Sequence, residues 1–189
     1  MERVKIGLCG LAIVFLASGC ATTKGTTPQE KREAVLSMKN AVLADLYKSR
    51  SMAKAEIAAA PGYAVFSNAN IYLFFVGVGG GHGVVHDNKT GKNIFMKMGE
   101  AGVGLGLGVK DFRAVFIFHD RAVMEKFIGS GWEFGGQADA AAKASDKGAA
   151  VGGEAVIDGI TIYQLTESGL ALQATVKGTK YWKDDDLNY

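Results

Sequence analysis

Early in the chain, apolar positions recur with helical spacing, and the residues before them form a helix start. Thr27 is placed to cap the helix, Pro28 fits the first helical position, and Glu30 completes a capping box with Thr27. The pattern predicts a helix that runs to about Tyr47. Its continuation to the stop at Pro61–Gly62 is left open by the sequence.

The predicted helix has an apolar face that is interrupted by basic residues. Arg32, Lys39 and Arg50 project into the middle of the apolar arc on a helical wheel. The arc consists of Val35, Leu36, Met38, Val42, Leu43, Leu46 and Tyr47. From Lys24 to Ala60, seven basic residues stand against four acidic ones. Such a helix can attract an anionic lipid surface, or dock its apolar residues on a sheet, and the sequence leaves both open.

From Tyr63 onward, aromatic and β-branched runs separated by glycines indicate strands. The polar segment 87–92 reads as a hairpin loop, and Asp120 is placed to cap a helix over 121–128 that ends at Gly129. The stretch 138–150 is ambiguous between helix and strand. Strands are predicted at 63–66, 71–78, 82–87, 93–98, 101–109, 112–118, 132–138, 152–164 and 169–177. The predicted class is α+β: a curved antiparallel sheet or partial barrel, with an N-terminal helix and short helices packed on it.

Glycine occupies alternate positions from Gly102 to Gly108, so one face of this predicted strand would be bare backbone. Glycine weakens a strand by roughly 0.5–1 kcal/mol relative to alanine, so four in register suggest a compensating contact. Close packing of another element and contact with a ligand are both consistent with the pattern.

The first twenty residues have the pattern of an export signal. Arg3 and Lys5 precede an apolar run, Ile6 to Leu16, that is too short to span a bilayer, and small residues follow it. Leu16 to Cys20 resembles a lipobox, in which the chain is cut before an acylated cysteine; Ala17 stands where leucine is most typical. We therefore expect a lipid on Cys20. The alternative is ordinary secretion with cleavage after Ala21.

Removal of the signal changes the charge and cysteine content. Loss of Glu2, Arg3 and Lys5 leaves 19 basic against 18 acidic residues, and Cys9 is lost as well, so the mature chain has no disulfide partner for Cys20. The near balance of charge, with no recognisable module, argues against a nucleic-acid partner. A hydrophobic content of 48% suits one folded domain.

No motif of the sequence points to catalysis. The glycine-rich run Gly77 to Gly83 has His82 where a dinucleotide fingerprint needs glycine, and it leads into a hairpin instead of a helix. His82 and His86 would lie about 13 Å apart along one strand, too far to share a metal, and His119 lies near Asp120 at a strand end. We expect no enzyme activity, no metal site and no cofactor.

The carboxyl end places three lysines beside three aspartates. A solvated rim is the simpler interpretation, and contact with a divalent cation or a lipid headgroup is the sharper one. The residues are Lys177, Lys180, Lys183, Asp184, Asp185 and Asp186.

Several motifs, taken in order, resemble the SYLF domain over residues 33–189. They are Ala60 to Phe66, Gly77 to Val85, the glycine-alternating strand around Gly104, Phe134 to Ala138, Ile162–Tyr163, Gly169 to Leu172 and Leu187–Asn188. Ser67 departs from the proline that the family often has. The resemblance implies a lipid-binding module: eukaryotic members bind phosphoinositides through an amphipathic N-terminal helix, and yeast relatives associate with actin. Bacterial members are commonly exported, and actin binding does not carry over to a bacterial envelope.

The sequence thus predicts a signal peptide at 1–19, a polar tether at 20–27 and a SYLF-like domain at 28–189. The predicted function is non-catalytic binding of lipid headgroups or an anionic membrane surface, with Lys31, Arg32, Lys39 and Arg50 as candidate contacts. Ala21 after the cysteine favours the periplasmic face of the outer membrane in the enterobacterial sorting pattern. The alternative is a structural envelope protein whose domain binds a protein partner.

Overall fold

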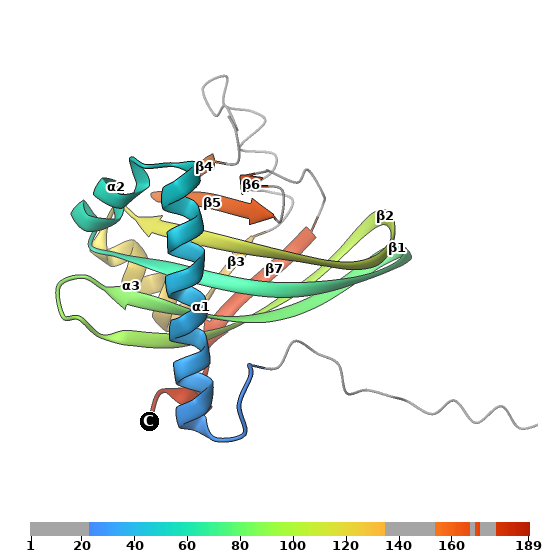
Figure 1. The fold of residues 1–189 in the computed structure, drawn as a ribbon, viewed down its shortest axis with the longest axis horizontal. Helices are drawn as coiled ribbons and strands as arrows, with labels where there is room; N and C mark the ends of the chain where they lie inside the picture. Colours follow the sequence, from blue (N-terminus) through green and yellow to red (C-terminus); the bar gives the residue numbers. More distant parts are fainter. Residues whose placement is uncertain (1–22, 135–153, 167–168, 171–176) are drawn as a thin grey trace, which may run out of the picture.

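A computed structural model describes residues 23–134, 154–166, 169–170 and 177–189. Within them, helices pack on a single antiparallel sheet that curls into a half-barrel, which confirms the predicted α+β class (Figure 1). The predicted signal peptide and Cys20, the predicted site of lipid attachment, lie outside the described residues, as does the ambiguous stretch 138–150.

The first helix is built as its sequence predicts. Helix α1 (Pro28–Ser49) starts at Thr27, whose side chain accepts a hydrogen bond from the Glu30 backbone N–H, and the Glu30 carboxylate accepts one from the Thr27 N–H in return. The helix is interrupted at residues 50–52, and a separate helix, α2 (Ala53–Ala59), follows. The apolar arc of α1 therefore ends before Ala53, and the Pro61–Gly62 stop ends α2.

Two strands of 26 residues dominate the sheet. Strand β1 (Gly62–Asp87) pairs with β2 (Asn93–Phe118) along their whole length, with one irregularity between Phe74 and Val76. The predicted loop 87–92 joins them, whereas the six short strands predicted at 63–118 are two continuous ones. The glycines from Gly102 to Gly108 lie in β2. The contacts of their bare face fall outside the part of the chain that the structure describes.

The other edge of β2 carries two more strands, one on each half. Residues 96–102 pair with β7 (Lys177–Lys183), and residues 113–118 pair with β5 (Ile160–Thr166). Beyond these lie β3 (Trp132–Phe134) on β7, with β4 (Glu154–Ile157) and the two-residue β6 (Gly169–Leu170) on β5.

Two predictions for the second half of the chain were wrong. The single strand predicted at 152–164 is a hairpin, because Asp158 and Gly159 both have positive φ (50° and 77°) and turn the chain between β4 and β5. Helix α3 (Arg121–Ser130) begins at the predicted Asp120 cap but passes through Gly129, and Gly131, with φ 74°, follows its end. The strand predicted at 132–138 is described only as β3, and that at 169–177 only at its two ends.

The curl brings the two halves of β1 against each other. A β-carbon at Gly83 would collide with the ring of Phe66, and one at Gly81 would collide with the Ser67 carbonyl oxygen. Backbone of one half therefore packs directly on the other, as the curved ribbons of Figure 1 indicate.

Alternating side chains of the sheet fill two cores. Inside the curl, Phe66, Phe116 and Tyr181 meet edge to face and are covered by Phe127 of α3. On the opposite face, Val42 and Leu46 of α1 pack against sheet residues that include Val65 and Ile117. Because successive side chains of a strand point to opposite faces, neighbouring residues of the sheet lie in opposite cores.

Candidate functional site

The candidate site begins as a row of three side chains across three strands. His82 of β1 pairs with Lys97 of β2, which pairs in turn with Trp182 of β7. Residues directly opposite each other in an antiparallel sheet project from the same face. Two residues along on the same face of the sheet, Gly80 pairs with Gly99. Neither residue has a side chain, so the sheet surface next to this row is backbone alone.

The carboxyl-terminal turn forms a wall beside this row. The Asp184 N–H donates to the Phe95 carbonyl oxygen at 3.0 Å, which fixes the start of a 3-10 turn, η1 (Asp185–Leu187), on β2. Leu187 is buried with Val35 of α1 and with Val84 and Phe95 of the sheet. The turn therefore holds its aspartates at the edge of the row.

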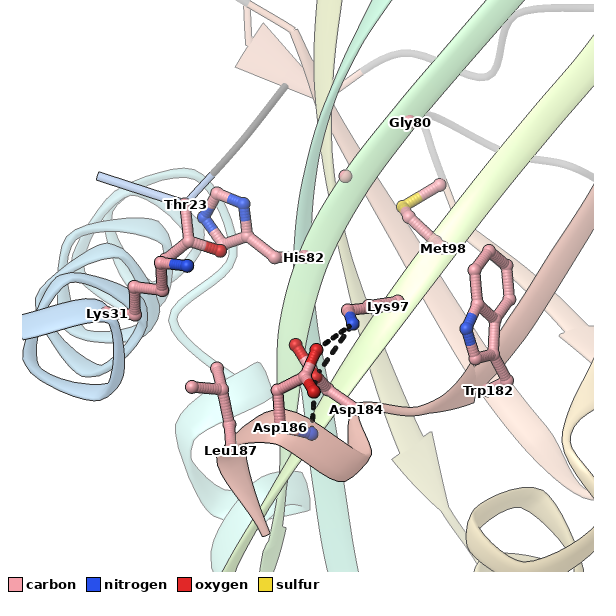
Figure 2. Close-up of a pocket in the computed structure, with 11 residues that line it drawn as sticks. Thr23, Lys31, Gly80, His82, Lys97, Met98, Trp182, Asp184, Asp186 and Leu187 are labelled. Atoms are coloured by element: carbon pink, nitrogen blue, oxygen red, sulfur yellow. Dashed lines mark hydrogen bonds and ion pairs between the residues drawn. The ribbon is translucent and has the colours of Figure 1, made fainter. Parts of the chain in front are cut away.

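Between these parts lies a cavity of about 330 Å³. Figure 2 shows Thr23, Lys31 and His82 on one side, Trp182 on the other, and Lys97 with the aspartates between them. The lining comprises Thr23, Lys31, Gly80, Gly81, His82, Lys97, Met98, Trp182, Asp184, Asp186 and Leu187. A volume near the lower end of the range for ligand sites suits a small headgroup-sized molecule.

Lys97 is held between two carboxylates. Its ammonium lies 2.9 Å from Asp184 Oδ1 and 3.0 Å from Asp186 Oδ2, and the hydrogen bond to Asp184 is the largest cause of its raised pKa. The Asp184 side chain is only 6% exposed, whereas that of Asp186 is 83% exposed. Asp184 is thus a fixed part of the wall, and Asp186 is open to solvent or a ligand.

The opposite side of the cavity carries different chemistry. Burial lowers the pKa of His82, which favours the neutral imidazole, and its buried Nδ1 has no hydrogen-bond partner among the described residues. Lys31 makes no ion pair with any residue that the structure describes. This side therefore presents a positive charge with no described ion-pair partner, beside a neutral imidazole.

The four candidate lipid contacts on the first helix do not form one patch. Lys31 lines the cavity, and Arg32 Nε donates to the Leu187 carbonyl oxygen at 2.9 Å while its guanidinium lies over the Tyr189 ring. Lys39 is half-buried, and burial lowers its pKa. Arg50 lies 5.9 Å from the Tyr163 ring centroid, about 28 Å along the helix direction from Lys31.

The structure adds residues that sequence reasoning did not assign to a site. His82 was considered only as a metal ligand, and Lys97 and Trp182 were not singled out at all. Their cross-strand row depends on β7, which was not predicted. The one available signal was the Lys–Asp cluster at the carboxyl end, for which headgroup contact was one interpretation.

The other histidines are engaged elsewhere. His86 Nδ1 lies 2.9 Å from Asn93 Oδ1, and His119 Nε2 lies 2.7 Å from Thr161 Oγ1. Among the described residues, no three histidine, cysteine or acidic side chains are placed to hold a metal ion. In the same part of the chain, every helix is too short or too polar to cross a bilayer.

Together, the fold and the cavity define an α+β half-barrel domain with a charged pocket beside Thr23 and the start of α1. No protein-family model matches the chain. The chain is homologous to Beta cell expansion factor A of Aeromonas veronii, with 36% identity over 167 residues. The match covers 85% of this chain and 60% of that protein, so the chain spans less than two thirds of its relative's length.

Proposed function

We propose that this chain is a lipoprotein of the bacterial cell envelope, anchored through Cys20, whose SYLF-like domain binds lipid headgroups without catalysis. The anchor would hold it at the periplasmic face of the outer membrane. Homology to a bacterial protein and the short apolar amino-terminal run support an envelope setting. SYLF membership rests on the ordered motifs of the sequence.

One observation carries the proposal: the cavity lies beside the tether. Thr23, which lines the cavity, is three residues after Cys20. Since an extended chain spans at most about 3.3–3.6 Å per residue, a lipid on Cys20 would lie within about 11 Å of Thr23. The cavity would then be held near the headgroup layer of the membrane.

The described packing of α1 limits how this helix can take part. Val35, Val42 and Leu46 are buried against the sheet, so the residues that a membrane-inserted helix would use are already occupied. Headgroup contact by α1 therefore rests on its basic residues, above all Lys31, which lies at the tether end of the helix.

Two experiments test the proposal. Intact-mass analysis of the membrane fraction should give an acylated Cys20 as the first residue, and an unmodified amino terminus at Thr22 would remove the anchor. Residues 21–189, which contain every described element, should co-sediment with vesicles of phosphatidylethanolamine and phosphatidylglycerol without the anchor.

The vesicle experiment includes a salt series and a matched pair of variants. Salt should weaken the part of binding that is due to surface charge, since the Debye length falls to about 8 Å at physiological ionic strength. Lys31→Gln should reduce retention, and Lys54→Gln, which removes an exposed basic residue of α2 away from the cavity, should not. No retention of the unlipidated chain on any vesicle would contradict membrane binding by the domain.

Binding of an envelope protein partner is a second candidate, favoured by strand β4. Among the described residues β4 pairs only with β5, and its Val156 is 65% exposed. An open strand edge can accept a strand from another chain. A defined complex, lost on Val156→Lys and formed without vesicle binding, would favour this function over headgroup binding.

A further inference from the structure

We propose that the cavity beside the tether selects a zwitterionic phosphoethanolamine headgroup, with the ammonium at Asp186 and Trp182 and the phosphate at Lys31 and His82. This inference rests on the proposed function, and it adds the class of headgroup and the residues that read each end of it.

The charges of the cavity are balanced but separated. Lys97 is shared by Asp184 and Asp186, so this group of three residues keeps one net negative charge. Lys31, on the other side of the cavity, carries one positive charge with no described ion-pair partner. A ligand with a cation at one end and an anion at the other complements this arrangement, whereas a purely anionic or cationic ligand meets a like charge at one end.

Trp182 gives the negative end an aromatic surface. A β-carbon at Gly99 would lie 3.2 Å from Cη2 and 3.4 Å from Cζ3 of the indole, so the absence of a side chain at Gly99 provides the place where the ring rests. The side chain is 38% exposed and lines the cavity. An ammonium held by a carboxylate beside an indole gains both ionic and cation–π attraction.

His82 supplies a polar group at the other end. Its Nδ1 is buried and lacks a hydrogen-bond partner in the described part of the chain, which is costly for a polar atom. The imidazole lines the cavity, and its neutral form can donate to a phosphate oxygen without adding charge. His82 and Lys31 flank the same side of the cavity in Figure 2.

A divalent cation is the competing ligand that paired aspartates suggest. The Lys97 ammonium already lies between the two carboxylates, 2.9 Å and 3.0 Å from their oxygens, where such an ion would have to lie. A metal would displace this ammonium and leave it unpaired. The arrangement therefore favours an organic ammonium at the open carboxylate, Asp186.

The test uses residues 21–189 and glycerophosphoethanolamine, the soluble headgroup of the phospholipid. Titration should shift the indole N–H signal of Trp182 in two-dimensional NMR to saturation, with the signal assigned through Trp182→Phe. Lys31→Gln and Asp186→Asn should each weaken binding about tenfold, as expected for loss of one charge-assisted contact. Lys54→Gln and Asp185→Asn are the matched controls, because both side chains are exposed and neither lines the cavity.

Partial ligands identify which end of the headgroup is read. Glycerophosphoglycerol, which lacks the ammonium, and ethanolamine, which lacks the phosphate, should both bind about tenfold more weakly or worse. Equal binding of either one, no saturable shift, or no effect of Lys31→Gln and Asp186→Asn would overturn the proposal. Vesicle retention without a headgroup shift would overturn only this inference, and a headgroup shift without vesicle retention would contradict only surface binding by the domain.

Discussion

The ring of Phe66 occupies the space into which a side chain at Gly83 would project, although both residues belong to strand β1. A β-carbon at Gly83 would collide with Cδ1 of that ring and lie 2.6 Å from Cε1. Phe66 is fully buried, and its ring meets those of Phe116 and Tyr181. The curl of the sheet therefore requires glycine at this point of self-contact.

Gly83→Ala should lower the free energy of unfolding by about 1–3 kcal/mol, because the methyl group overpacks a core that cannot move away easily. Urea unfolding of residues 21–189 measures this change. The control is Gly129→Ala in α3, where an added β-carbon meets nothing within 4 Å and alanine is the better helix former by about 0.5–1 kcal/mol. A Gly83→Ala variant as stable as the wild type would contradict the packing of β1 on itself.

Asp87→Asn should destabilise the fold by about 1–3 kcal/mol. Asp87 Oδ2 lies 3.0 Å from Arg121 Nη2, and Oδ1 accepts from the Lys89 N–H at 2.9 Å, so one carboxylate joins the hairpin loop to α3. Glu125→Gln removes an exposed partner of the same arginine and should cost less than about 0.5 kcal/mol. Equal effects of the two substitutions in thermal unfolding would refute the structural role of Asp87.

The same carboxylate should give the fold an acid dependence. The hydrogen bond from Arg121 holds the pKa of Asp87 well below its ordinary value of 3.8. A depressed pKa contributes stability that is complete above the ordinary value and is lost as pH falls toward the folded-state value. The stability difference between wild type and Asp87→Asn should therefore be constant near neutrality and shrink below about pH 4.

Glu30 should titrate far below the ordinary range of a glutamate. Hydrogen bonds from the Thr27 and Thr26 backbone lower the pKa of its carboxyl from 4.5 to about 2. Its contribution to the helix start is therefore complete above the ordinary value and disappears as pH falls toward 2. Carboxyl NMR of Glu30 measures the midpoint directly. Thr27→Ala, which breaks the capping box, should move the midpoint upward and cost about 1 kcal/mol of stability.

Asn188→Ala should loosen the carboxyl-terminal turn. The Asn188 amide accepts from the Phe95 N–H at 2.9 Å and donates to the Phe95 carbonyl oxygen at 2.7 Å, so it pairs with β2 as a strand would. Hydrogen exchange of the Phe95 amide should accelerate in the variant and stay unchanged in Asp185→Asn. An unaffected Phe95 amide would show that the Asn188 side chain does not hold the turn on β2.

Local signals in the sequence predicted the local structure well. Thr27, Pro28 and Glu30 form the expected helix start, and the polar loop 87–92 joins two strands as expected. By contrast, the turn at Asp158–Gly159 was available as an Asp-Gly hairpin signal and was missed, because the apolar residues on both sides read as one strand.

The candidate site was less predictable because its parts meet through register. Nothing in the spacing of His82, Lys97 and Trp182 along the chain says that they form one row, since β2 must first pair with both β1 and β7. The helical wheel placed Arg32 and Lys39 within the apolar arc of the first helix. It could not show that Arg32 would contact the Leu187 carbonyl oxygen and the Tyr189 ring. Of the four helix candidates, only Lys31 lines the cavity.

The contacts of Leu187 and Asn188 have a consequence for when the protein can fold. Leu187 completes the cluster around Val35, and Asn188 pairs with Phe95, so α1 and β2 reach their final packing only after residue 188 has been made. Contacts between residues that are far apart in the sequence form late and slowly. A chain that is still being synthesised therefore lacks the contacts that close α1 onto β2 at this end of the sheet.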